Sequence, residues 1–277
     1  MFEVRESHIA EVSRTGRVTA QRAGTTAVMV RYLGQSATVS VAVPFSAEPL
    51  AMEFQPANFL DELVFAEWQR MRVRPVPLAS DEEFLRRVGL DLIGTLPTPD
   101  ELRACLADTS INKRAKWIDG LLARPEYVDC WAMRWDDLLR SHRRYLGAKG
   151  LASFTGWLKQ SLRDNKPLDV MTRELLTTQG NLYANGAVGY FFIDEKVEDL
   201  HATNPAAVPA VLDRLARELT EHNFDAKHVL RVICNARVYQ LAGELQFSRD
   251  PDGQLCTHQV PRRMSAEVLL DAASQDT

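Results

Sequence analysis

Apolar residues near the N-terminus alternate with polar ones, which is the pattern of β-strands. In ATVSVAV the odd-numbered positions from Ala37 to Val43 would share one face, because successive side chains of a β-strand point to opposite sides. The preceding run, TTAVMVRYL, is rich in β-branched and aromatic residues. Gly34-Gln35 between the two runs predicts a tight hairpin turn. Residues 1–45 are therefore predicted to be β-rich, and the proline-containing residues 46–57 to be a linker.

From residue 58 onward the apolar period becomes that of helices, with stripes at spacings of three and four. This spacing predicts helices over 58–71, 81–92, 151–163, 168–178 and 265–274, and a helical pair containing 208–219 and 229–233. GYFFID, at 189–194, is predicted to be a short strand or an extended segment. The predicted fold is mainly α, a multi-helix bundle preceded by a small β-rich segment.

Local capping chemistry marks several helix starts. TPDE, from Thr98 to Glu101, combines a capping box with proline at the first helical position. Ser110 is predicted to cap the next helix, and Pro125 to open the helix after it. Asp225 is predicted to cap a helix near the C-terminus.

The composition of the 277 residues is that of a globular protein, with 45% hydrophobic and 25% charged residues. Its 33 basic and 37 acidic residues leave a net charge of −4, which argues against nucleic acid as a partner. No run approaches the roughly 20 apolar residues of a membrane-spanning helix. MFEVRESHIAEVSRTGR lacks the apolar core of a signal peptide, which taken literally predicts a cytoplasmic chain.

Cysteine and histidine spacing gives no metal or haem motif, so no cofactor is predicted. Scattered cysteines without C-x-x-C spacing are expected to be buried thiols, and this describes Cys105, Cys130, Cys234 and Cys256. The six histidines show no H-x-x-x-H spacing. His222 and His228 flank a predicted turn but stand six residues apart.

The N-terminal run VSRTGRVTAQRAGTTAVMVRYLGQSATVSVAV resembles the C-terminal part of a bacterial immunoglobulin-like domain of group two. In that family a G-x-V-T-A-x-x-x-G-T-x-x-V run precedes a final hairpin. A complete sandwich of this type needs about seven strands, whereas three or four fit before Phe45. The resemblance therefore implies a partial sandwich that lacks its N-terminal half.

FLRRVGLDLIGTLPTPDEL and KWIDGLLARPEYVDCWAMRWDDLLR resemble the first of a pair of domains of unknown function. This pair is expanded in planctomycetes and often lies beside cytochrome c modules. NPAAVPAVLDRLARELTEHNFDAKHVLRVICNARVYQL and PRRMSAEVLLDAASQ resemble the second domain. The resemblance divides the helical region into a first domain over 58–198 and a shortened start of the second over 199–277.

Relatives with this pattern carry a C-x-x-C-H segment between the two domains, a spacing that indicates covalent haem attachment or a metal site. Here VEDL passes directly into HATNPAAVPAVL. The resemblance therefore implies a truncated and internally deleted form without haem. It also implies a location in the periplasm or cell envelope, in contrast to the N-terminal sequence.

Two pairs of residues are candidates for structural or binding roles. Arg87 and Asp91 lie at i and i+4, and we expect an ion pair that either fixes helix registry or forms a buried charged site. Trp131 and Trp135 share a helix face with Tyr127. This stripe either belongs to the core or lines a sugar-binding groove.

Arg262 and Arg263 form part of the family pattern PRR and either bind an anion or tie the terminal segment to the bundle. Nucleophile-elbow, phosphate-loop, dinucleotide and zinc-protease motifs are missing from the sequence. No catalytic residue is therefore predicted.

Three functional hypotheses stay open. The leading one is a non-catalytic binding or scaffold module derived from a cell-envelope multidomain protein, with envelope proteins or polysaccharide as partners. The second is an enzyme or redox component acting on extracellular polymer, which requires carboxylates such as Asp91 with Asp136 or Glu267 to converge. The third is a remnant without independent function, whose hydrophobic hairpin face lacks its partner sheet.

Overall fold

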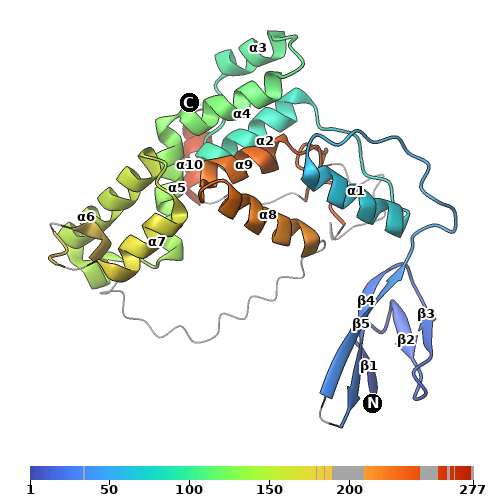
Figure 1. Cartoon of the computed structure of the whole chain (residues 1–277). Coiled ribbons are helices and arrows are strands. Elements are labelled where there is room, and N and C mark those ends of the chain that lie inside the picture. The colour runs from blue at the N-terminus through green and yellow to red at the C-terminus, as the bar shows by residue number, and fades with distance from the viewer. Residues whose placement is uncertain are drawn as a thin grey trace.

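A body of helices and a smaller β unit make up the structure, and the β unit projects from the helices at the N-terminal end (Figure 1). The structure is a computed structural model that describes residues 1–33, 35–178, 180–183, 185–188, 209–243, 255–260, 263–264 and 266–275. The predicted class, mainly α with a preceding β segment, is confirmed. The predicted extended segment GYFFID lies outside the described residues.

The β unit contains two antiparallel sheets. One has three strands in the order β1-β4-β5, and the other pairs β2 with β3. The strands are β1 (Phe2–Val4), β2 (Ala10–Val12), β3 (Val18–Ala20), β4 (Gly24–Tyr32) and β5 (Gln35–Val43).

The predicted hairpin is formed by β4 and β5, with Gly24 opposite Val43 and Tyr32 opposite Gln35. Gln35 was predicted to lie in the turn but is the first residue of β5, so the second strand begins one residue earlier than predicted. The first half of β5 is exposed, and 55% of the Val39 surface is accessible. The predicted apolar face of β5 is thus exposed to solvent along the first half of the strand.

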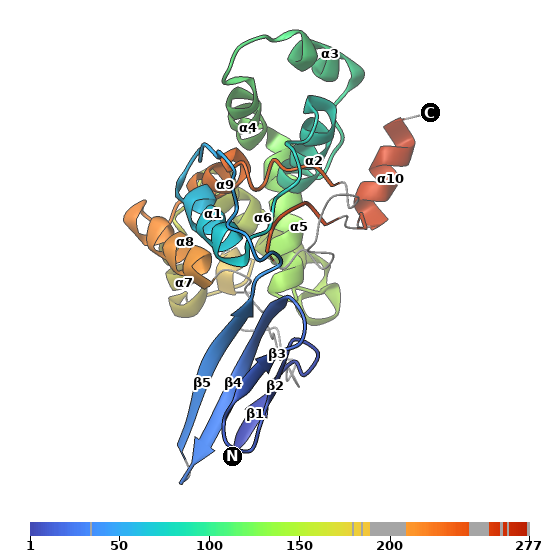
Figure 2. The same ribbon diagram turned by 90° about the vertical axis from the view of Figure 1, so that its right-hand side faces the viewer.

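The described residues form ten helices. They are α1 (Phe59–Met71), α2 (Asp81–Ile93), α3 (Pro99–Ala107), α4 (Lys113–Ala123), α5 (Pro125–Leu138), α6 (Arg143–Arg163), α7 (Leu168–Thr177), α8 (Pro209–Glu221), α9 (Ala226–Asn235) and α10 (Ala266–Gln275). Figure 2 shows α10 at the margin of the helical body. None of the helices in the described part of the chain combines the length and apolar character that a membrane crossing requires.

The strongest sequence signals for helix starts are confirmed. The Thr98 side chain accepts from the backbone N–H of Glu101, and the Glu101 carboxylate accepts from the backbone N–H of Thr98, completing the capping box. Pro125 is the first residue of α5, and the Asp225 side chain caps α9.

Two predicted helix starts are wrong. Asn112, not Ser110, is the N-cap of α4, and the Ser110 hydroxyl instead accepts a hydrogen bond from Lys116 Nζ. Helix α6 begins at Arg143 rather than at Leu151. Gly147, with φ of +66°, interrupts the regular backbone of α6. The helical spacing of apolar residues therefore marks only the part of α6 that follows Gly147.

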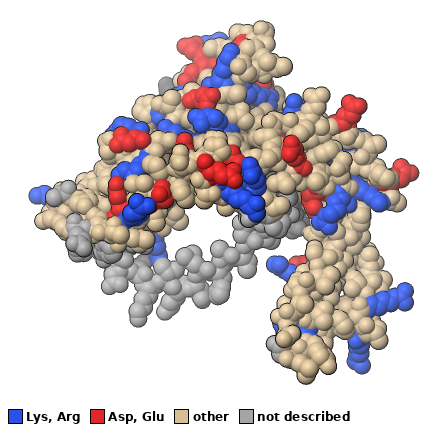
Figure 3. Space-filling view, viewed as in Figure 1, with Lys and Arg blue, Asp and Glu red and all other residues tan. Residues whose placement is uncertain are grey.

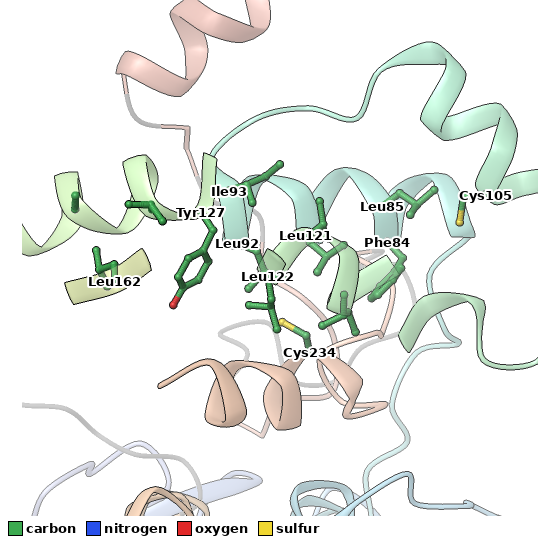
Figure 4. Close-up of a cluster of buried hydrophobic side chains, with 14 residues drawn as sticks. Phe84, Leu85, Leu92, Ile93, Cys105, Leu121, Leu122, Tyr127, Leu162 and Cys234 are labelled. Carbon is green, nitrogen blue, oxygen red and sulfur yellow. The ribbon is translucent and has the colours of Figure 1, made fainter. Parts of the chain in front are cut away.

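The main hydrophobic core joins α2, α4 and α5 to α9. Phe84, Ile118, Leu122 and Tyr127 are at most 2% exposed, and Cys234 of α9 reaches the same cluster (Figure 4). Helix α9 therefore completes a core begun by helices that start about one hundred residues or more earlier in the chain. The predicted buried thiols are confirmed for three cysteines (Cys105, Cys130, Cys234), while Cys256 is partly buried.

A second core fixes α1 against the segment after α9. The Trp68 side chain is fully buried and donates from Nε1 to the backbone oxygen of Leu255 at 2.7 Å. Leu78 and Leu241 form an isolated antiparallel bridge beside it. A third cluster packs α6 against α7, with Phe154 and Leu158 at its centre.

Charged side chains of both signs are interspersed over the helical face shown in Figure 3. This agrees with the small net charge of −4. On that face no large patch of a single sign covers the described helices.

Candidate ligand pocket and Glu-His cluster

The end of α6 forms a turn that makes one wall of a pocket. Asn165 has a left-handed backbone, with φ of +48°, a conformation that asparagine tolerates well. Its N–H donates to Leu162 O, and the N–H of Lys166 donates to Ser161 O at 2.8 Å. These two bonds form a Schellman motif, which stops the helix and reverses the chain into α7.

The reversed chain encloses a cavity of about 120 Å³ between α5, the end of α6, the start of α7 and the start of α9. Its lining is mostly apolar. We call this cavity the aromatic pocket, after the rings of Tyr127, Trp131 and Trp135 that line it. Three polar residues of the α6 turn also line it: Ser161, Asn165 and Lys166.

Two rings of the pocket, those of Tyr127 and Trp131, are held by a hydrogen bond, by cations beside the rings and by each other. Trp131 donates from Nε1 to Leu92 O at 3.0 Å, and the Arg134 guanidinium lies 4.8 Å from its ring centre. The Tyr127 and Trp131 ring centres are 5.8 Å apart, and Lys227 Nζ lies 4.5 Å from the Tyr127 ring centre. The predicted aromatic stripe therefore packs against the core and also lines a cavity. A role of this stripe in sugar binding stays a prediction.

The polar groups that line the pocket differ in whether they have a hydrogen-bond partner. The Ser161 hydroxyl is buried and has no hydrogen-bond partner among the described residues. Lys166 Nζ lies 2.6 Å from a carboxylate oxygen of Glu174. Burial alone would raise the pKa of Glu174, but hydrogen bonds from Lys166 and Trp157 outweigh it, so the pKa lies below its usual value.

The predicted ion pair between Arg87 and Asp91 is wrong. Arg87 instead lies 2.6 Å from Glu83 Oε1 and donates to the backbone oxygens of Tyr239 and Leu241, each at 2.8 Å. Asp91 accepts a hydrogen bond from the Tyr239 hydroxyl. The segment after α9 runs along α2 and supplies partners to both residues, so the charges fix registry between these elements.

The carboxylates required by the enzyme hypothesis have other partners where the structure describes them. Asp136 accepts from the Ser141 hydroxyl at 2.6 Å and from the Thr155 hydroxyl at 3.0 Å. The side chain of Glu267 lies outside the described residues.

Of the two terminal arginines singled out by the sequence, Arg262 lies outside the described residues. Arg263 is exposed. Its predicted role in binding an anion or in tying down the terminal segment stays a prediction.

Glu218, His222 and His228, which we call the Glu-His cluster, bring three possible metal ligands together. Glu218 Oε1 lies 3.0 Å from His228 Nε2 and 3.4 Å from His222 Nδ1. One ligand atom from each residue falls within 4.8 Å of the others, and the two rings stack with centres 3.8 Å apart. The hydrogen bond with His228 lowers the pKa of Glu218, so this group stays a carboxylate.

Sequence spacing did not reveal this cluster because its histidines are six residues apart. The backbone of Asn223 and Phe224 is left-handed, with φ of +56° at both. This double turn folds α9 back against α8 and brings His222 next to His228. The only local signal was the i, i+4 spacing of Glu218 and His222 on α8.

The fold and its site define a mainly α-helical protein with an aromatic pocket and an N-terminal β unit. Residues 59–221, more than half of the chain, match the family model PSCyt2, described as a protein of unknown function (DUF1549). The chain belongs to this family. Residues 193–276 match the model PSD1, also described as a protein of unknown function (DUF1553). No curated protein and no solved structure matches the chain.

These matches confirm the predicted resemblance of the helical region to the paired domains. The resemblance of residues 1–45 to an immunoglobulin-like module stays a prediction, as does the division of the helical region at residues 198 and 199.

Proposed function

We propose that this chain is a non-catalytic binding module of a cell-envelope protein and that the aromatic pocket binds one sugar ring of an extracellular polysaccharide. The observation that carries the proposal is the lining of the cavity by Tyr127, Trp131 and Trp135. Sugar rings present C–H faces that pack on aromatic rings, while their hydroxyls seek polar groups.

The polar groups around the pocket complement such a ligand. Trp131 uses its indole N–H on Leu92 O, whereas Trp135 makes no such bond with the described part of the chain. The buried Ser161 hydroxyl lacks a partner among the same residues. Asn165 and Lys166 add amide and ammonium groups to the lining, and each of these groups also donates to a carboxylate, that of Asp225 or Glu174. Such a mixture supports a ligand with both apolar faces and hydroxyls.

The size of the cavity limits how much ligand it takes. About 120 Å³ is less than the roughly 300–1,000 Å³ of pockets that hold whole small molecules. One ring or chain end would therefore occupy the cavity, with the rest of the polymer outside it.

The carboxylates beside the pocket favour binding over catalysis. Glu174 is held by Lys166 and Trp157, and its lowered pKa makes it a poor general acid. Asp136 is engaged by two hydroxyls. Glu174 is therefore not poised as the protonated partner that glycoside hydrolysis requires.

Affinity electrophoresis of the full chain against separate soluble polysaccharides of neutral pyranose units tests the proposal. At least one polymer should retard the chain, and Trp135→Ala should weaken this binding about tenfold, roughly 1.4 kcal/mol. Tyr183→Ala, at a side chain that is 66% exposed and outside the pocket lining, is the matched control and should bind normally.

Because Trp135 also packs against the core, a second variant fills the pocket while all three rings stay in place. Ala226→Leu places a larger side chain in the lining and should abolish retardation without loss of helical circular dichroism. Failure of every polymer to retard the wild-type chain, or equal retardation of the filled variant, would overturn the proposal.

A further inference from the structure

We propose that the Glu-His cluster is a binding site for a divalent transition-metal ion of the zinc class, separate from the aromatic pocket. The site would hold the ion by one carboxylate oxygen of Glu218 and one ring nitrogen each from His222 and His228. It does not depend on the proposed sugar binding, because none of its three residues lines the aromatic pocket.

The spacing of the donor atoms suits a small tetrahedral ion. Zn–N and Zn–O bonds of about 2.0–2.1 Å place the ligand atoms of a tetrahedron roughly 3.3 Å apart. Glu218 Oε1 lies 3.0 Å from His228 Nε2 and 3.4 Å from His222 Nδ1. The edge between Glu218 and His228 is therefore present before any ion binds. His222 Nδ1 also lies 2.9 Å from the backbone oxygen of Glu218 and must leave that oxygen to complete a second edge.

One ring must turn for both histidines to point their lone pairs at the same ion. The rings are stacked at an interplanar angle of 12°, so their lone pairs lie in nearly parallel planes. His222 has 44% of its side-chain surface exposed, against 25% for His228. His222 is therefore the ring that turns, and its exposure leaves the fourth position of the ion open to solvent.

The backbone holds the ligands in place from both sides. The N–H of Phe224 donates to Leu219 O at 2.8 Å, which ends α8 beside His222. Asp225 Oδ1 accepts from the backbone N–H of His228 and from Asn165 Nδ2. The left-handed backbone of Phe224 is unfavourable for a bulky residue, and backbone strain of this kind is concentrated at functional sites.

Charges around the cluster leave one carboxylate oxygen for a cation. Arg214 Nη2 lies 3.2 Å from Glu218 Oε2, whereas both histidines face Oε1. Arg214 also lies 3.8 Å from Glu221 Oε2. Two carboxylates and one guanidinium thus lie around the two imidazole rings and give a local charge that favours a cation.

The donor set selects the class of ion. Two imidazole nitrogens and one carboxylate oxygen suit Zn²⁺, Co²⁺, Ni²⁺ and Cu²⁺, whereas Ca²⁺ and Mg²⁺ prefer sites made of oxygen. Affinities should follow the general order in which Cu²⁺ binds most tightly and Co²⁺ more weakly than Zn²⁺.

Isothermal titration of the metal-stripped full chain with Zn²⁺ tests the proposal. The wild type should bind one ion, and His222→Ala and His228→Ala should each weaken binding about tenfold or more. His142→Ala is the matched control, because His142 is an exposed histidine at the N-cap of α6, and it should bind like the wild type.

Substitution of Co²⁺ gives a second readout that reports coordination directly. Visible absorption of tetrahedral Co²⁺ should appear with the wild type and with His142→Ala, and be lost with His222→Ala. Because His222 is half exposed, its removal leaves the fold intact, which circular dichroism would confirm. Equal Zn²⁺ binding by the wild type and His222→Ala, or no binding by either, would overturn the site and leave a structural hydrogen bond between Glu218 and His228.

Discussion

Tyr239 donates a 2.6 Å hydrogen bond from its phenolic hydroxyl to Asp91 Oδ2. Asp91 lies on α2 within the region matched by the first family model, and Tyr239 follows α9 within the region matched by the second. Burial raises the pKa of Tyr239, so the phenol stays protonated and keeps donating. The two matched regions therefore meet through a polar contact at the edge of a shared core.

Tyr239→Phe should destabilise the chain by about 1–3 kcal/mol, because Asp91 would keep its partly buried carboxylate but lose this donor. Urea unfolding followed by circular dichroism measures the change. Asp91→Asn and the double variant complete a thermodynamic cycle, in which the two residues should couple by at least about 0.5 kcal/mol. Additive effects of the two substitutions would show that the hydrogen bond contributes nothing specific.

Asp61 is a buried carboxylate that serves as a backbone acceptor rather than as half of an ion pair. It is 0% exposed and accepts from the N–H groups of Ala57, Arg237 and Val238 at 2.7, 3.0 and 2.9 Å. Asp61→Asn replaces one accepting oxygen by a donor and should cost about 2–4 kcal/mol of unfolding free energy.

Glu62→Gln is the control for Asp61→Asn, since Glu62 is the next residue of α1 and is exposed. It should change stability by less than about 0.5 kcal/mol. Thermal unfolding of the two variants under the same conditions compares them, and equal midpoints would contradict the bridging role of Asp61.

A pH dependence follows from Asp81 at the start of α2. Burial alone would raise its pKa, but hydrogen bonds from Lys113 and Arg114 prevail and lower it below the usual 3.8. Since the folded pKa is the lower one, the contribution to stability is complete above the unfolded pKa and is lost as the pH falls through the folded one.

Wild type should therefore lose more unfolding free energy than Asp81→Asn when the pH is lowered from about 6 to about 3. Urea unfolding at a series of pH values gives both curves, and their difference isolates this carboxylate from the others. Parallel curves would show that Asp81 has the same pKa in the folded and unfolded chain.

Local chemistry explains which parts of the fold were predictable from sequence. The Thr98 capping box and Pro125 act within one helical turn, so the residues that form each start are adjacent in sequence. Arg87 and Asp91 were assigned to each other because the spacing showed only their own helix. Arg87 pairs with Glu83 of the same helix. The other partners of Arg87 and the partner of Asp91 are Tyr239 and its neighbours, from a segment about 150 residues away, which no local pattern indicates.

The candidate sites likewise combine features that the local sequence indicates with features that depend on distant segments. Trp131 and Trp135 were visible as a stripe, but the cavity also requires the left-handed turn at Asn165 and the start of α9. His222 and His228 became neighbours only through two consecutive left-handed residues. A positive φ at a residue such as Phe224 opposes its intrinsic preference, so tertiary packing rather than local sequence determines it.

Two helical glycines in similar sequence contexts should respond oppositely to alanine. A Cβ on Gly89 of α2 would lie 2.9 Å from the backbone oxygen of Thr95, whereas a Cβ on Gly120 of α4 meets nothing within 4 Å. Gly89→Ala should therefore destabilise the chain by about 1–3 kcal/mol through overpacking against backbone. Gly120→Ala should stabilise it by roughly 0.5–1 kcal/mol, because alanine loses less backbone entropy in a helix. Urea unfolding of both variants checks the opposite signs, and a gain of stability in Gly89→Ala would show that the turn after α2 yields to an added methyl group.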